Sequence, residues 1–154
     1  MTKQKKIMCA ASWVLTALCM AAIFFFSHQN SDASAEISMD FYSKILELIG
    51  RVAERLGHDG IRTLAHFTEY TALGFLMSTS LMFTCSRRRP WLTLGLCAAY
   101  AVTDEIHQLF VPGRAFQVKD MAVDSAGALL GISVFFLLSL IILNIQKKKT
   151  GPIT

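Results

Sequence analysis

Charged residues are scarce in this sequence of 154 residues, where they make up 17% of the chain and hydrophobic residues make up 53%. An average soluble domain carries about 25% charged residues, so this balance excludes most soluble folds. The same scarcity excludes a disordered or acidic-tail protein, which needs the opposite balance. The four cysteines contain no C-x-x-C spacing, and we interpret them as small apolar packing residues rather than as a metal site or a redox pair.

The lysines and arginines are grouped rather than spread along the chain. Nine of the fifteen lie in three short clusters at residues 3–6, 87–89 and 147–149, each beside an apolar stretch. Such clusters are typical of membrane flanks, so the net charge of +4 does not indicate a nucleic-acid partner.

Long apolar stretches predict the fold class. Residues 7–26 carry no charge, and about 20 apolar residues are enough for a helix to cross a membrane. Three further stretches at 61–83, 91–111 and 116–145 predict an all-α membrane protein with four transmembrane helices in a single domain over residues 1–154. A cleaved signal peptide is the alternative for the first stretch, because Ala33-Ser34-Ala35 resembles a cleavage site. Its apolar run is longer than the usual h-region of about 7–15 residues, which favours a retained anchor.

Four spans place the three basic clusters on one side of the membrane, and the positive-inside rule assigns that side, with both termini, to the cytoplasm. The segment between the first two spans is then exterior. Its apolar residues recur every three or four positions from Ile37 to Leu56, which predicts an amphipathic helix over about 37–56 with Gly57 as its C-cap. This periodicity fits a helix on the outer membrane surface and a helix packed over the bundle equally well.

Acidic residues inside the predicted spans indicate a candidate site. Five of the eleven acidic residues of the chain lie there: Glu69, Asp104, Glu105, Asp120 and Asp124. A charge at the centre of a membrane helix costs on the order of 2.5–3.5 kcal/mol, so these five are not incidental. At a rise of about 1.5 Å per residue they fall, together with His66 and His107, about 6–12 Å below the outer ends of the predicted spans.

Helical spacing predicts that these side chains converge. Residues three or four apart share one side of a helix, so the polar residues form one stripe on each of the last three spans. Gly127 and Gly131 form a G-x-x-x-G pattern, which lets helices approach closely. We therefore expect an acidic, histidine-containing pocket that opens to the outer leaflet, with Arg114 at its mouth.

Three interpretations of this pocket remain open. A buried ion-pair network would fix helix packing, but it would leave five acids facing few cations. A divalent metal ion is a candidate cofactor, because His66-x-x-Glu69 and Asp104-x-x-His107 resemble the ligand pairs of metal sites in helix bundles, although no metal ligands are assigned. A proton relay or a head-group site used in transport is the third interpretation.

Several stretches resemble the signature motifs of the VanZ-like membrane proteins. They are His66-Phe67-Thr68-Glu69-Tyr70 with Leu73-Gly74, and Asp104-Glu105-Ile106-His107-Gln108-Leu109-Phe110-Val111-Pro112-Gly113-Arg114. Asp120 and Asp124 before Gly127 and Gly131 are similar to the family's third motif, and Phe26-Ser27-His28-Gln29 is similar to the end of its first helix. The resemblance implies a small multi-pass protein of the bacterial plasma membrane. The founding member of the family is associated with resistance to the glycopeptide teicoplanin.

The resemblance also implies that the pocket is functional, without naming a reaction. We expect its ligand to be a membrane lipid or a lipid-linked precursor of the cell envelope; the sequence leaves enzymatic activity and oligomeric state open. The catalytic candidates are Glu69, Asp104, His107 and Asp120. The ligand-binding candidates are His66, Tyr70, Glu105, Gln108, Arg114 and Asp124. In an enzyme, Glu69 or Asp104 would act as the general base, His107 as acid or ligand, and the Arg114 guanidinium as a phosphate clamp.

Overall fold

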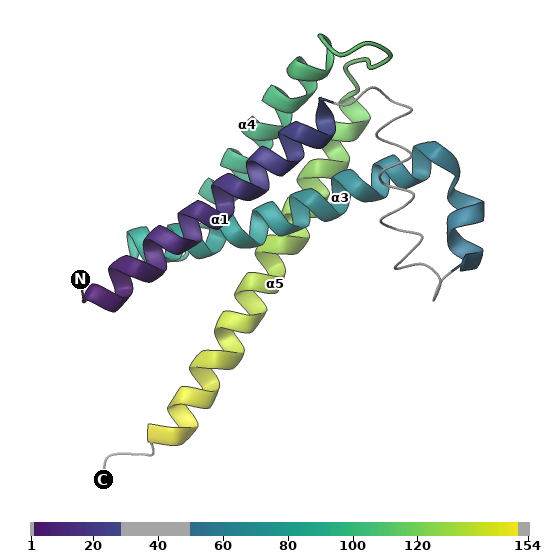
Figure 1. Cartoon of the computed structure of the whole chain (residues 1–154). Helices are drawn as coiled ribbons and strands as arrows, with labels where there is room; N and C mark the ends of the chain where they lie inside the picture. The colour runs from purple at the N-terminus through teal and green to yellow at the C-terminus, as the bar shows by residue number, and fades with distance from the viewer. Residues whose placement is uncertain (1, 29–49, 151–154) are drawn as a thin grey trace.

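A computed structural model of the protein describes residues 2–28 and 50–150. In these ranges every regular element is a helix: α1 (Lys3–Ser27), α3 (Gly50–Cys85), α4 (Pro90–Gln108) and α5 (Val118–Thr150). The predicted all-α fold class is therefore confirmed. Figure 1 shows α1 and α4 lying against α3, while α5 crosses α3 and extends beyond the other helices toward its C-terminal end.

Contacts between α3 and α5 show that these two helices run in the same direction. Arg62 of α3 pairs with Asp120 of α5, and one turn further along both helices His66 pairs with Asp124. Residue numbers therefore rise together along the interface. Because α4 comes between the two helices in the chain, it must return in the opposite direction.

The helix α1 runs antiparallel to α3. Near its start the Lys5 Nζ donates a hydrogen bond to Ser86 Oγ at 2.8 Å, just beyond the C-terminal end of α3. Further along α1, the Thr16 and Ser80 hydroxyls lie 2.9 Å apart. The first two basic clusters are thus at the same end of the bundle, and Figure 1 shows α5 also ending away from the 109–117 loop.

The end of α4 and the start of α5 differ from the predicted spans by two or three residues. The helix α4 starts at Pro90, and the first position of a helix is one that proline favours. It ends at Gln108 rather than at residue 111. The chain turns here because Pro112 cannot continue the helix and Gly113 has a φ of 78°. The helix α5 begins at Val118 instead of residue 116. The acids of α4 therefore lie in its last turn, shallower than the sequence predicts.

The predicted exterior helix over 37–56 lies mostly outside the described residues. From Gly50 onward the chain already belongs to α3, which continues without a break to Cys85. Gly57 therefore does not end a helix, and its prediction as a C-cap is wrong. A glycine inside a helix costs only about 1 kcal/mol relative to alanine, which the packing of a long helix can offset.

Two of the described helices meet the length and hydropathy of a membrane span, namely Lys3–Ser27 and Val118–Lys148. The helices α3 and α4 do not, so the structure supports two of the four predicted spans. Charged residues lower the hydropathy of α3, and α4 has only 19 residues with Asp104 and Glu105 near its end. Many large apolar side chains of α1 and α5 are exposed, as expected for surfaces that face lipid.

The interface of α3 with α5 is built on close backbone contact. A Cβ atom added to Gly127 would overlap the carbonyl oxygen of Phe67, and one added to Gly131 would overlap the carbonyl oxygen of Thr71. The G-x-x-x-G pattern therefore does what its spacing predicts. This close approach brings the first turns of α5 against the polar side of α3.

Candidate functional site

Polar side chains from all four helices converge at one end of the bundle. At this end α1 and α4 finish, the loop 109–117 turns back, α5 begins, and α3 passes with its polar side inward. The three polar stripes predicted from the sequence are brought together, since Glu69, Asp104 and Asp124 all lie close enough to His66 to interact electrostatically with it.

Two ion pairs hold α3 to α5. The His66 Nδ1 lies 3.2 Å from Asp124 Oδ1, and the Arg62 guanidinium donates to the Asp120 carboxylate. Both aspartates are buried, and Asp124 is fully enclosed. Two of the predicted site carboxylates are therefore engaged in helix packing.

The ends of α1 and α4 are joined by a second set of contacts. The Gln108 Nε2 donates to Ser27 Oγ at 2.9 Å and to Asp104 Oδ2 at 3.4 Å. His107 faces α1 instead, where its Nε2 lies 3.1 Å from Nδ1 of His28. The ring centroid of His107 is also 4.3 Å from that of Phe24.

The loop between α4 and α5 is fastened to the helices on both sides. The Glu105 carboxylate accepts a hydrogen bond from the backbone N–H of Gln117 at 2.7 Å, which ties α4 to the start of α5. The Arg114 Nη2 donates to the carbonyl oxygen of Phe26 at 3.4 Å. Burial, together with the neighbouring guanidinium of Arg62, lowers the pKa of Arg114. Two like charges held close together favour an anion between them.

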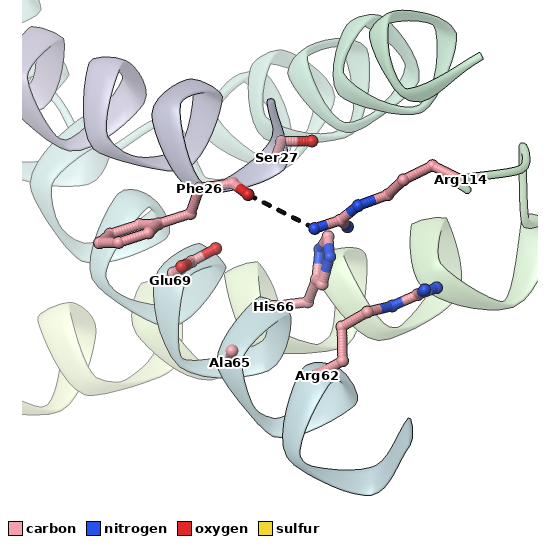
Figure 2. Close-up of a pocket in the computed structure, with 7 residues that line it drawn as sticks. All are labelled: Phe26, Ser27, Arg62, Ala65, His66, Glu69 and Arg114. Atoms are coloured by element: carbon pink, nitrogen blue, oxygen red, sulfur yellow. Dashed lines mark hydrogen bonds between the residues drawn. The ribbon is translucent and has the colours of Figure 1, made fainter. Parts of the chain in front are cut away.

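A small pocket opens among these residues. It is lined by Phe26, Ser27, Arg62, Ala65, His66, Glu69 and Arg114. Figure 2 shows Arg114 reaching from the loop over His66 toward the backbone of Phe26, while Glu69 approaches the same space from α3. Its volume of about 10 Å³ is enough for about one water molecule. A whole lipid head group would therefore need either a wider conformation of the pocket or the space beside it.

The predicted site residues fall into three groups around this pocket. His66, Glu69 and Arg114 line it. Six others are buried and do not line it: Tyr70, Asp104, Glu105, Gln108, Asp120 and Asp124. His107 lies on the side of α1, against His28.

The pocket wall is less acidic than the sequence predicts. Its charged or titratable groups are two arginines, one histidine and the carboxylate of Glu69. The other predicted acids do not line the opening, and three of them bond to neighbouring elements: Asp120 to Arg62, Asp124 to His66 and Glu105 to Gln117. Arg62 and His66 of α3 thus pair with two of the acids, while Glu105 is bonded to a neutral backbone N–H group.

Several buried oxygen atoms have no hydrogen-bond partner in the described part of the chain. Among them are Tyr70 Oη, Asp104 Oδ1 and Asp124 Oδ2. Leaving a buried polar atom unsatisfied costs about 1–3 kcal/mol, so a network serving packing alone would be expected to pair them. These atoms retain hydrogen-bonding capacity at the centre of the site.

Metal coordination finds no support in this geometry. Across residues 2–28 and 50–150, no three His, Cys, Asp or Glu side chains lie close enough together to hold a metal ion. The pairs His66 with Glu69 and Asp104 with His107 share a helix side, but His66 is bonded to Asp124 and His107 faces His28. The predicted ligand pairs thus do not meet as one ligand set.

The structure adds residues that the sequence did not assign to the site. Arg62 lines the pocket, and its place on the polar stripe of His66 and Glu69 was a usable signal. Ser27 and His28 bond to α4, and their signal was the similarity of the Phe26-Ser27-His28-Gln29 stretch to a family motif. No periodicity within α1 singles out these two residues.

Two of the described helices are long and apolar enough to cross a membrane, by length and composition. The sequence model of the VanZ/LLP1 family matches residues 12–140, and the chain belongs to this family. The resemblance drawn from the motifs is thereby confirmed, and family membership together with the two apolar helices indicates a membrane protein. No curated protein and no solved structure matches the chain.

Proposed function

We propose that this chain is a four-span protein of the bacterial plasma membrane that binds the phosphate-bearing head group of a cell-envelope lipid and thereby alters teicoplanin susceptibility. The observation that carries the proposal is the meeting of Arg62 and Arg114 with His66 and Glu69 around one pocket. Arg114 comes from the 109–117 loop and the other three residues come from α3. Two guanidinium groups are a suitable arrangement for a phosphate.

The directions of the helices support four spans. Parallel α3 and α5, with α1 antiparallel to α3, alternate in the way that four successive crossings require. The outward face of α4 also fits a lipid environment, because it exposes large apolar side chains: Trp91, Leu92, Leu96, Val102 and Ile106. The polar side of α3 is turned inward, which explains how a helix of low hydropathy could still cross a membrane.

The basic clusters support an outward-facing pocket. Lys5 and Ser86 bring the first two clusters to the end of the bundle opposite the pocket. The positive-inside rule places that end, with both termini, in the cytoplasm. The pocket then opens toward the outer leaflet, where envelope precursors are exposed.

The geometry favours binding over an acid–base mechanism. Of the catalytic candidates, only Glu69 lines the pocket, while Asp104 is buried outside it and Asp120 is bonded to Arg62. His107 lies against His28 at the end of α1 and does not line the pocket, so it is not placed to act as an acid beside Glu69. We therefore propose that Arg114 binds the phosphate, and that Glu69 and His66 form hydrogen bonds with other donors and acceptors of the head group.

The alternative function is a scaffold whose buried charges only stabilise the bundle. The ion pairs of Asp120 and Asp124 favour that role for these two residues. It does not account for Glu69 and Arg114 at the opening, or for the unpartnered oxygens of Tyr70 and Asp104.

Replacing Arg114 tests the proposal. With Arg114→Gln, a teicoplanin-sensitive host is expected to be as susceptible as cells that lack the protein. The substitution removes the positive charge that contacts the phosphate. Arg114→Lys keeps the charge without the planar fork, and a partial effect is expected. The measurement is the inhibitory concentration of teicoplanin at matched membrane abundance.

Arg87→Gln is the matched control, since Arg87 is an exposed arginine in the turn at the other end of the bundle. This variant should behave as the unmodified protein does. If Arg114→Gln keeps the full effect at normal abundance, Arg114 does not serve the function. If that variant is absent from membranes, Arg114→Lys decides: susceptibility identical to that of the unmodified protein would argue against a bidentate phosphate contact.

A further inference from the structure

An apolar groove runs along the outer side of α3 and α5. It has a volume of about 320 Å³ and is lined by Gly60, Thr63, Leu64, Phe67, Val123 and Ala126. Apart from the hydroxyl group of Thr63, its lining side chains are hydrocarbon. Its surface therefore suits an acyl chain rather than a polar ligand.

A polar cavity of about 140 Å³ adjoins this groove. It is lined by Arg62, Thr63, Gln117, Lys119 and Asp120. Thr63 borders both spaces, so the groove and the cavity lie next to each other. A polar cavity beside an apolar groove matches the amphipathic character of a single lipid molecule.

The charge of the cavity favours an anion. Arg62 and Lys119 bring two positive charges against the single carboxylate of Asp120, which is already bonded to Arg62. The cavity also lies at the start of α5, and the N-terminal end of a helix carries a partial positive charge that favours phosphate. Lys119 is exposed and can reach a ligand at the rim.

We propose that one anionic phospholipid occupies this place, with its phosphate against Arg62, which lines both the cavity of Lys119 and the pocket of Arg114, and with an acyl chain in the groove between α3 and α5. The lipid enters sideways from the outer leaflet. Arg62 also lines the pocket of His66, Glu69 and Arg114, so the rest of the head group is directed toward that pocket. This deepens the proposed function and rests on its outward-facing topology, and it gives the head group the space that the small pocket lacks.

Lipid binding to the purified full chain tests this site. We would titrate phosphatidylglycerol, and separately the zwitterionic phosphatidylcholine, in detergent and count bound lipid by native mass spectrometry. Phosphatidylglycerol is expected to bind more tightly. Lys119→Gln should weaken the binding of phosphatidylglycerol about fivefold, as expected for one basic residue near an anionic lipid, and should leave the binding of phosphatidylcholine unchanged. Lys6→Gln, at an exposed lysine of the opposite end, is the matched control and should change neither.

Filling the groove tests the acyl-chain part separately. Ala126 is exposed on α5, so Ala126→Trp can occupy the groove without disturbing the core. It is expected to weaken both lipids by about tenfold or more, since losing the burial of two methylene groups already has this effect. Ala99→Trp on the exposed side of α4 is the matched control and should leave both affinities unchanged. If Ala126→Trp gives a poor yield, Ala126→Phe serves the same purpose.

The outcomes separate a lipid site from its alternatives. Equal binding of the two lipids, with no effect of Lys119→Gln, would overturn the phosphate site. Full competition by soluble glycerol 3-phosphate, together with unchanged binding in Ala126→Trp, would indicate a site for free phosphate and overturn the lipid proposal. If neither Lys119→Gln nor Ala126→Trp changes lipid binding while Arg114→Gln still abolishes the effect on teicoplanin susceptibility, the proposed function stands. Only the lipid site in the groove and cavity would then be rejected.

Discussion

The His66→Leu variant is expected to lose most of its folded protein from the membrane. Its leucine would leave the fully buried Asp124 without the imidazole that now lies 3.2 Å away. Removing one partner of a buried ion pair costs about 3–5 kcal/mol, a large part of the about 5–15 kcal/mol that stabilises a typical domain. Thermal unfolding in detergent and membrane abundance would both report the loss.

A double variant separates the cost of the orphaned charge from the loss of the histidine. His66→Leu with Asp124→Leu replaces the whole pair by apolar side chains, which is often neutral or stabilising. We expect it to recover most of the stability that the single variant loses. A single variant as stable as the unmodified protein would contradict the pairing of α3 with α5. So would a double variant no more stable than the single one.

The Gly131→Ala variant is expected to lower the unfolding temperature clearly. Its new methyl group would overlap the carbonyl oxygen of Thr71, which is backbone and can move only if α3 and α5 separate. Overpacking of this kind typically costs about 1–3 kcal/mol and occasionally more. The measurement is the unfolding midpoint of the purified protein in detergent.

Gly95→Ala is the matched control for this prediction. A Cβ atom added to Gly95 meets no atom within 4 Å, and the residue lies inside α4. Alanine is favoured over glycine in a helix by about 1 kcal/mol, so this variant should be as stable as the unmodified protein or slightly more so. Equal midpoints for the two variants would show that the interface does not depend on backbone contact at Gly131.

Helical periodicity carried most of the correct predictions. It grouped His66 with Glu69 on α3 and Asp120 with Asp124 on α5, because the residues that share a helix side depend only on their spacing. The glycine spacing likewise predicted where α5 approaches a neighbour. Hydropathy found α1 and α5, which expose many large apolar side chains.

The partner of each charge could not be predicted, because it depends on the register between different helices. The spacing of Asp120 does not reveal that Arg62 lies opposite it. Nor does it reveal that two arginines and a single carboxylate line the pocket. Hydropathy alone also does not decide whether α3 is a span, since it counts a polar residue the same way whether it faces lipid or the bundle. The end of α4 at Gln108 depends on the turn at Gly113. Hydropathy placed this end at residue 111 because the apolar run continues to that residue.

The central claim is that the pocket between α1, α3 and the 109–117 loop acts on a ligand. Glu69→Gln tests it most directly, since Glu69 lines the pocket and glutamine matches its shape while removing the charge. The measurement is teicoplanin susceptibility of a sensitive host at matched membrane abundance. We expect the Glu69→Gln protein to reach the membrane normally and yet to leave the host as susceptible as cells without the protein. A host as resistant as one carrying the unmodified protein would contradict it.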